Sequence, residues 1–301
     1  MYLGTPAVAV PPLLALDDAG FDIALVVSRP DKRRGRGSKL SPSPVKQAAR
    51  ERGIPVTDAI EDALTVDADL GVVVAYGRLI ATPILAALPM VNIHFSLLPR
   101  WRGAAPVERA ILAGDATTGV GLMALAPELD TGDIYAQREL AIGDNDTLDQ
   151  LRAALVTLGS TMLVEELGAG LGPPRPQIGE PTYAAKLTTE DHRLDFTHPA
   201  AELHRVVRLG RAWTMFRDKR LKVVAAEPVA CPSSHPGAAD EANTLAGTTV
   251  VAANPGELSG AVVHTGHGCL HLHQVQPEGK RVMEAAAWLN GIQPQPGERL
   301  G

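Results

Sequence analysis

Asn92, His94 and Asp130 are the side chains of this sequence whose types and spacing are best suited to chemistry. Asn92 and His94 lie two positions apart, so on an extended strand both project from the same face. An amide can stabilise an oxyanion, an imidazole can hold or move a proton, and a carboxylate can orient and charge the imidazole. Together these groups are suited to the transfer of a one-carbon acyl group.

Each of the three residues also has an ordinary structural explanation. Asn92 could cap a turn, His94 could be a hydrogen-bonded core histidine, and Asp130 could begin a turn before Gly132. The combination favours a functional site, because a polar cluster at the end of an apolar strand is costly to bury without a purpose.

The first half of the chain alternates between apolar, strand-like runs and helical patterns. This order predicts a parallel, three-layer α/β sheet. In such sheets the chemistry lies at the carboxyl ends of the strands, where Asn92 and His94 are expected. The runs that predict strands are 22–28, 71–75, 91–94 and 120–125, and those that predict helices are 11–19, 44–52, 106–113 and 148–167.

The second half of the chain differs in composition. A length of 301 residues favours about two domains. Residues 168–181 are rich in Gly and Pro, which is typical of a linker, and short β-like runs follow. We therefore predict a Rossmann-like, parallel-sheet catalytic domain at 1–173, a linker at 174–195 and a small OB-like β-barrel domain at 196–301.

Basic residues are concentrated in two places, although the net charge is −6. Six basic side chains lie between Arg29 and Lys39, against the single acid Asp31. Seven lie between Arg205 and Lys222. This distribution predicts a polyanionic partner that touches the protein in two places. The alternative is two solvated surfaces without a partner.

The cysteines and the hydropathy bear on the cellular compartment. Only two cysteines occur, Cys231 and Cys269, far apart in the sequence, which argues against a disulfide framework and fits a reducing compartment. No run approaches the ~18 apolar residues of a membrane span, and we find no signal segment. We expect a cytoplasmic protein without membrane contact.

Histidines are crowded near the C-terminus, where His264, His267, Cys269, His271 and His273 fall within one predicted hairpin. His271 and His273 share a strand face. A zinc site is conceivable, but the spacing matches no standard zinc motif. The pattern therefore favours a polar, outward strand face, and we expect no metal.

Short motifs over nearly the whole chain resemble those of the methionyl-tRNA formyltransferase family. The Asn-x-His and Asp residues are common to enzymes that depend on 10-formyltetrahydrofolate, whereas the basic loop before residues 42–44 and the C-terminal barrel are typical of the tRNA enzymes. The motifs are residues 4–6, 29–31, 35–40, 42–46, 74–77, 92–94, 96–106, 129–133, 182–187 and 193–195.

The resemblance implies an activity and roles for the three polar residues. A formyl group would pass from 10-formyltetrahydrofolate to the α-amino group of methionine on initiator tRNA. Asn92 would donate a hydrogen bond to the developing oxyanion. His94 would do the same when protonated, or would shuttle a proton. Asp130 would hold His94 and help the attacking amine to lose its proton.

The resemblance also assigns binding residues. The folate site would be lined by Ser96, Leu97, Leu98 and Pro99. The residues expected at the phosphates of tRNA are Arg29, Lys32, Arg33, Arg34, Arg36 and Lys39 in the first basic cluster, and Arg205, Arg208, Lys219 and Arg220 in the second.

Two other functions compete with this interpretation. The same chemistry could act on another acceptor, such as a nucleotide-linked amino sugar, but the basic loop and the barrel weigh against it. A catalytically weak RNA-binding protein is the second rival, since Phe95 stands where the family commonly has a small residue. The intact Asn92, His94 and Asp130 weigh against that rival. We expect a monomer, because no large apolar surface can be recognised.

Overall fold

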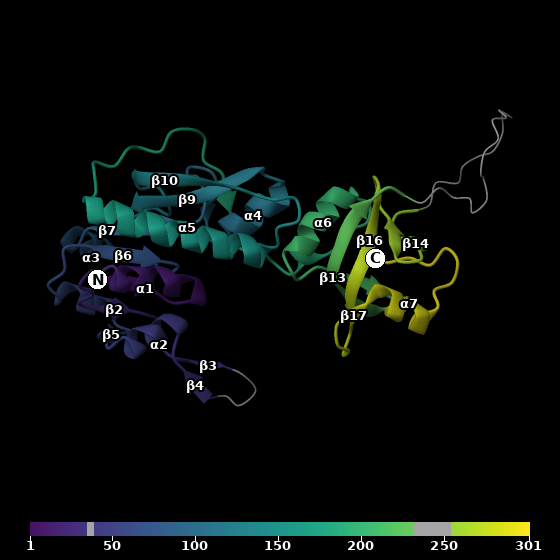
Figure 1. Ribbon diagram of the computed structural model, residues 1–301, viewed down its shortest axis with the longest axis horizontal. Helices are drawn as coiled ribbons and strands as arrows, with labels where there is room; N and C mark the ends of the chain where they lie inside the picture. Colours follow the sequence, from purple (N-terminus) through teal and green to yellow (C-terminus); the bar gives the residue numbers. More distant parts are fainter. Residues whose placement is uncertain (35–38, 232–253) are drawn as a thin grey trace. The chain divides into compact units, whose positions relative to one another are not determined.

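The computed structural model describes residues 1–34, 39–231 and 254–301, so the expected tRNA contact Arg36 lies outside the described residues. The chain divides into two compact units, Met1–Lys186 and Leu187–Gly301 (Figure 1). The limits predicted from composition, 173/174 and 195/196, stay a prediction. Part of the predicted linker forms the short strand β11 (Tyr183–Ala184), which pairs in parallel with β8 (Arg102–Gly103) of the first unit.

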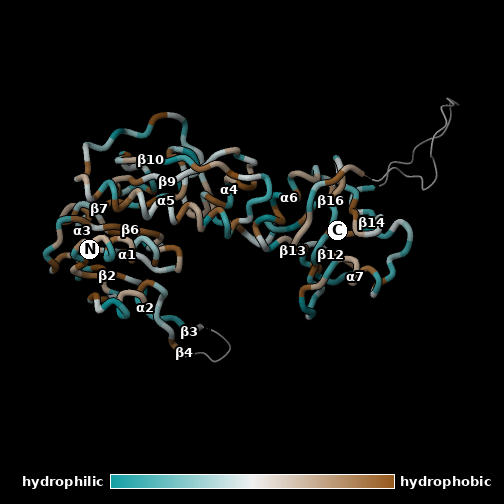
Figure 2. Tube along the Cα trace, in the orientation of Figure 1, coloured by the Kyte–Doolittle hydropathy of each residue, from teal (hydrophilic) through white to brown (hydrophobic). Residues whose placement is uncertain are grey.

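The first unit contains a seven-stranded sheet in the order β10-β9-β7-β6-β1-β2-β5. The strands from β5 to β7 run parallel, and their central members, such as β6, are hydrophobic along their length (Figure 2). The bounds are β1 (Tyr2–Gly4), β2 (Val26–Val27), β5 (Val56–Thr57), β6 (Gly71–Val74), β7 (Met90–His94), β9 (Thr117–Ala124) and β10 (Ile134–Ala141).

The parallel order does not extend over the whole sheet, which corrects part of the sequence-based expectation. Strand β9, predicted at 120–125 as a member of a parallel sheet, runs antiparallel to β7, and β10 runs antiparallel to β9. The prediction missed β10 because Ile134–Ala141 alternates between half-buried and exposed residues, as an edge strand does, and lacks a continuous apolar run.

Helices cover both faces of this sheet. Helix α3 and the short helix η2 pack with Leu3, Val27 and Val73 on one face. Helix α5 packs against β9 and α1 on the other, where Gly159 lets it approach Val120 and Ile93. The bounds are α1 (Val10–Asp18), α2 (Pro44–Glu51), η2 (Ile60–Leu64), α3 (Thr82–Ala87), α4 (Pro106–Ala113) and α5 (Leu148–Ala169), with η1 (Ala7–Ala9) before α1.

Local sequence signals account for the ends of these helices. Ser43 caps α2 by accepting a hydrogen bond from the Lys46 amide, and Pro44 follows in the first turn. Thr147 and Gln150 form a capping box at the start of α5. Helix α4 ends at Gly114, whose φ of 73° suits glycine.

The second unit is built around an antiparallel sheet in the order β12-β13-β16-β15-β14, with β17 paired to β16. Phe216 and Trp288 meet edge to face in its core, with ring centroids 5.2 Å apart. The bounds are η3 (Glu190–His192), α6 (Ala200–Arg208), β12 (Trp213–Phe216), β13 (Lys219–Val229), β14 (Leu258–Ser259), β15 (Val262–His264), β16 (Cys269–Pro277), β17 (Met283–Glu284) and α7 (Ala285–Ile292). An α/β unit followed by a separate antiparallel unit confirms the predicted fold class.

The sequence argued against a disulfide framework, but Cys231 and Cys269 form a disulfide. Their separation of 38 residues hides their proximity in the fold. Strands β13 and β16 are antiparallel and place Val229 opposite Cys269, and the chain after β13 brings Cys231 to a Cα–Cα distance of 5.1 Å from Cys269. Composition alone gave no sign of this register.

None of the helices in the described parts of the chain combines the length and the apolar character that a bilayer span requires.

Two glycine substitutions should affect stability in opposite directions. A Cβ at Gly119 would lie 2.2 Å from the carbonyl oxygen of Arg138, so Gly119→Ala must displace β9 from β10. A Cβ at Gly168, in α5, would meet nothing within 4 Å. We expect Gly119→Ala to lower the free energy of unfolding by roughly 1–3 kcal/mol and Gly168→Ala to raise it by about 0.5–1 kcal/mol. Urea denaturation measures both, and equal effects would contradict this packing.

Candidate active site

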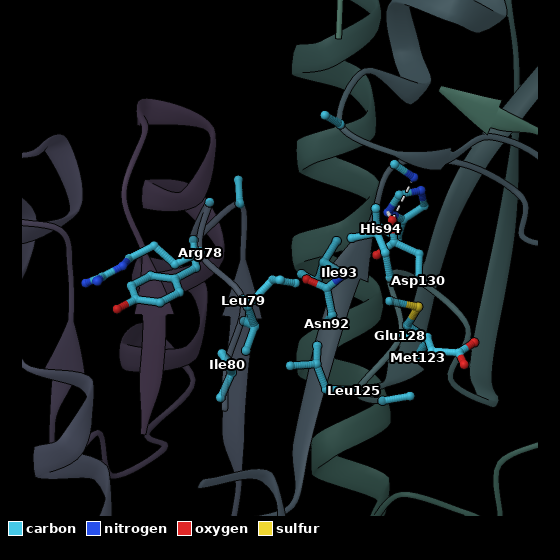
Figure 3. A pocket seen from close by; sticks show the side chains of 18 of the residues that line it. Arg78, Leu79, Ile80, Asn92, Ile93, His94, Met123, Leu125, Glu128 and Asp130 are labelled. Atoms are coloured by element: carbon cyan, nitrogen blue, oxygen red, sulfur yellow. Dashed lines mark hydrogen bonds and ion pairs between the residues drawn. The ribbon is translucent and has the colours of Figure 1, made fainter. Parts of the chain in front are cut away.

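The three polar residues that the sequence singles out line one cavity of about 500 Å³ in the first unit. Asn92 and His94 project from β7, and Asp130 enters from the loop after β9 (Figure 3). Because β6 and β7 are parallel neighbours, their carboxyl ends open on the same edge of the sheet. The expected convergence of amide, imidazole and carboxylate is therefore present.

The His94 ring is hydrogen-bonded at one nitrogen and has a carboxylate near the other. Its side chain is buried, with Nε2 2.9 Å from the carbonyl oxygen of Trp101 and Nδ1 3.7 Å from Asp130 Oδ2. A carbonyl oxygen can only accept a hydrogen bond. Nε2 must therefore carry a proton and donate a hydrogen bond to the Trp101 carbonyl oxygen. Nδ1 then faces the Asp130 carboxylate.

Asp130 is held in an uncommon backbone conformation, with a φ of +54°. Its Oδ2 accepts a 2.7 Å hydrogen bond from the amide of Gly103, which follows the chain reversal after β7. Such conformations persist only where the surroundings fix them, and they cluster at functional sites. The carboxylate therefore keeps its position beside His94 through a main-chain donor from another segment.

Gln177 binds the main chain of the same loop. Its Nε2 donates to the carbonyl oxygens of Asp130, at 2.9 Å, and Gly132, at 2.8 Å. Its Oε1 accepts from Nε and Nη2 of Arg102. The sequence analysis missed Gln177 because it lies in the segment interpreted as a linker. The one feature of the sequence that could have pointed to a role for Gln177 is its polar amide within a stretch rich in proline and glycine.

The rest of the cavity wall is largely apolar. Leu79 and Leu129 line it and are 82% and 59% exposed, which is unusual for leucines beside a cavity and suits side chains that a ligand covers. Ile80, Leu125 and Phe95 line the same space (Figure 3 labels the first two). Phe95 adds an aromatic surface and leaves the cavity open.

The residues expected to line a folate site lie away from this cavity. Ser96 is fully buried, and its hydroxyl donates to the carbonyl oxygen of Arg100 at 2.6 Å. Leu98 is also buried, and Leu97 borders a separate hollow. Among the described residues, those around the cavity do not include these three or Pro99. Their role in folate binding stays a prediction.

The first basic cluster is carried by a hairpin of β3 (Lys32–Arg34) and β4 (Lys39–Ser41). Lys32 and Arg33 are exposed there, and Arg29 precedes the hairpin. Lys46 anchors its base, with Nζ 2.7 Å from Asp31 and 3.7 Å from Asp58. The hydrogen bond from Lys46 lowers the pKa of Asp31. Arg34 and Lys39 contribute backbone to the paired strands.

The second basic cluster lies on the other unit. Lys219 and Arg220 are exposed at the start of β13, and the Arg220 guanidinium lies 4.0 Å from the centroid of the Trp213 ring. Arg205 is half-buried on α6, whereas Arg208 is 9% exposed. Arg208 therefore presents little of its side chain to a phosphate in this conformation.

Solved structures with a similar fold include formyl-transferring enzymes. An N-formyltransferase from Helicobacter canadensis, in complex with folinic acid and dTDP-3-aminofucose, has a TM-score of 0.65 at 17% identity, over 90% of this chain and 97% of that one. HypX from Aquifex aeolicus, in complex with tetrahydrofolic acid, has a TM-score of 0.56 at 18% identity, over 82% of this chain and 44% of that one. At these identities the likeness concerns the fold.

Sequence comparison gives closer relatives. A methionyl-tRNA formyltransferase of Thiobacillus denitrificans is 42% identical, over 100% of this chain and 99% of its own length. Another, of Heliobacterium modesticaldum, is 39% identical over the same shares. The family models for formyl transferase and for the formyl transferase C-terminal domain match residues 3–167 and 186–293. With both models matched along nearly the whole chain, this protein belongs to the formyl transferase family.

Proposed function

We propose that this protein transfers the formyl group of 10-formyltetrahydrofolate to the α-amino group of methionine on initiator tRNA. The observation that carries the proposal is the cavity in which Asn92, His94 and Asp130 converge. The similarity to methionyl-tRNA formyltransferases over the full length of the chain supports the choice of acceptor.

The cavity suits a folate donor. Its volume of about 500 Å³ lies within the usual range of small-molecule sites. The exposed Leu79 and Leu129 offer an apolar surface to a flat ring system. Tetrahydrofolic acid and folinic acid are bound by the two proteins of similar fold. The 10-formyl derivative is the form that carries a transferable group.

The three polar residues divide the chemistry among them. The methionine amine attacks the formyl carbon, a new C–N bond forms, and the formyl oxygen becomes an oxyanion. Asn92 donates a hydrogen bond to that oxygen, and His94 assists from Nδ1 when protonated. The bond between the formyl carbon and N10 of folate then breaks. The amine loses its proton with the help of Asp130, and through His94 in the alternative in which Nδ1 starts unprotonated, while N10 takes up a proton.

The basic residues bind the tRNA in this proposal. Lys32 and Arg33 on the β3–β4 hairpin contact phosphates near the methionyl end, and Lys219 and Arg220 contact the tRNA elsewhere. Contacts of this kind position the nucleic acid without reading its bases. The protein works as a cytoplasmic monomer in this scheme.

A nucleotide-linked amino sugar is the main rival acceptor, because the Helicobacter canadensis protein of similar fold binds dTDP-3-aminofucose. The two basic clusters favour tRNA, because a tRNA offers many phosphates along its backbone. A sugar nucleotide carries only a diphosphate and would not contact both clusters. The deciding experiment supplies purified protein and 10-formyltetrahydrofolate with initiator methionyl-tRNA, elongator methionyl-tRNA or an amino-sugar nucleotide. We expect product with the initiator alone. Product with the sugar alone overturns the proposal.

Removing the amide of Asn92 should reduce turnover without affecting tRNA binding. Loss of one oxyanion donor typically costs about 10²–10³ in rate. We expect Asn92→Ala to lower kcat by that factor in the formylation assay, while filter binding of methionyl-tRNA stays at the wild-type level. Wild-type turnover by this variant would contradict the role given to Asn92.

Gln177 should act as a positioning residue through its amide donor. Gln177→Glu keeps an acceptor for Arg102 but directs a carboxylate at the carbonyls of Asp130 and Gly132. Gln177→Ala removes both contacts. We expect both variants to lower kcat by roughly 10²-fold, as about 1 Å of misplacement can do, with little change in the KM for tRNA. Wild-type kcat in Gln177→Glu would show that only the Arg102 contact matters.

Neutralising the β3–β4 hairpin should change the salt dependence of tRNA binding. Each phosphate contact adds about 0.7–0.9 to the slope of log K against log salt. We expect the double variant Lys32→Ala/Arg33→Ala to bind more weakly and to lose roughly 1.4–1.8 of that slope. Arg175→Ala, an exposed cation outside both clusters, is the control and should keep the full slope. Equal slopes for all three proteins would exclude the hairpin from the interface.

A further inference from the structure

The outer face of β16 carries two histidines that formyl transfer does not use. Leu270 and Leu272 are at most 1% exposed and point into the core of the second unit. His271 and His273 alternate with them, so their side chains lie on the opposite face, where they are 36% and 41% exposed. From the sequence a zinc site was conceivable here, but the spacing favoured a polar strand face and no metal. The structure adds a third group beside the two imidazoles.

That third group is the carboxylate of Glu227, which lies directly opposite His271 in the antiparallel register of β13 and β16. Its Oε1 is 3.7 Å from His271 Nδ1 and 3.2 Å from His273 Nε2, and one donor atom from each side chain lies within 4.8 Å of the others. Ligand atoms around a tetrahedral zinc ion with bonds of about 2.0–2.1 Å are roughly 3.3–3.4 Å apart. The distances of 3.2 and 3.7 Å from Glu227 Oε1 to the two imidazole nitrogens bracket that spacing.

An irregularity in the strand pairing falls at His273. Ala226 pairs with Leu272, but the next residue of β13, Ala225, pairs with Gln274, so His273 is the extra residue of a β-bulge. Bulges commonly re-aim a side chain. The two imidazole rings meet at a steep angle with centroids 4.6 Å apart, and a nitrogen of each approaches Glu227.

We propose that Glu227, His271 and His273 form a binding site for a divalent transition-metal ion, with zinc as the probe. Imidazole nitrogen favours zinc, copper and nickel over magnesium and calcium, which prefer sites made of oxygen. Three protein ligands leave a fourth position for water, and the partial exposure of all three side chains gives an ion access. This site departs from the expectation of no metal and is independent of the proposed formyl transfer.

A neighbouring group of possible ligands has to be kept separate in the test. Cys231, His264 and Cys269 also place ligand atoms within 4.8 Å of one another. The disulfide occupies both sulfur atoms, so this group offers only His264 while the bond is intact. Zinc titration without reductant therefore isolates the site at Glu227.

The experiment is isothermal titration calorimetry of the protein, residues 1–301, with ZnCl₂ in buffer without reductant or chelator. We expect one zinc ion per chain, and His271→Ala and His273→Ala should each weaken the affinity about tenfold or more. Glu227→Gln, nearly isosteric, should also weaken it because the amide carries no charge. His198→Ala is the matched control, since His198 lies near Asp195 and Glu202 but has no second histidine in its group. It should bind as the wild type does.

A second measurement separates a defined site from loose surface binding. Co²⁺ bound at three protein ligands should give a visible d–d absorption band in the wild type that His271→Ala/His273→Ala lacks, with unchanged far-UV circular dichroism. The proposal is overturned if the wild type binds no zinc, if the double variant binds zinc as tightly as the wild type, or if His198→Ala loses as much affinity as His271→Ala.

Discussion

The fixed position of the Asp130 carboxylate is the constraint on which the active site depends. A φ of +54° is uncommon for a non-glycine residue, and contacts from outside the loop hold Asp130 in it. The Gly103 amide holds the side chain, and Gln177 holds the backbone on both sides of Thr131. Three segments far apart in the sequence therefore meet around Asp130.

The packing around this point leaves little tolerance. Gly103 has a φ of +117°, and a Cβ there would lie 2.9 Å from the carbonyl oxygen of Ala184 in β11. A Cβ at Gly132 would lie 1.8 Å from the carbonyl oxygen of Ala124. Both glycines allow main chains to approach closely, which brings the Gly103 amide to Asp130 and the Gly132 carbonyl to Gln177. Backbone contacts, rather than side-chain bulk, set the geometry beside His94.

Much of this arrangement could be predicted from the sequence, for identifiable reasons. Apolar runs revealed the central strands, and the spacing of Asn92 and His94 on one of them indicated a shared face. Three features could not be predicted, because each depends on how two distant segments come together. They are the contacts of Gln177, the antiparallel direction of β9 and the Cys231–Cys269 disulfide. Composition describes a segment by itself, whereas these features belong to two segments at once.

The two edges of the large sheet bear on self-association. At one edge β5 is only two residues long, which offers few free main-chain groups to another chain. At the other, β10 carries Arg138 and Glu139, and the Arg138 guanidinium is bound to Glu165 of α5. Charges on an edge strand oppose pairing with a strand of a second molecule. Both edge strands of the sheet therefore disfavour pairing with a second molecule. This lowers the tendency of the protein to aggregate through its strand edges.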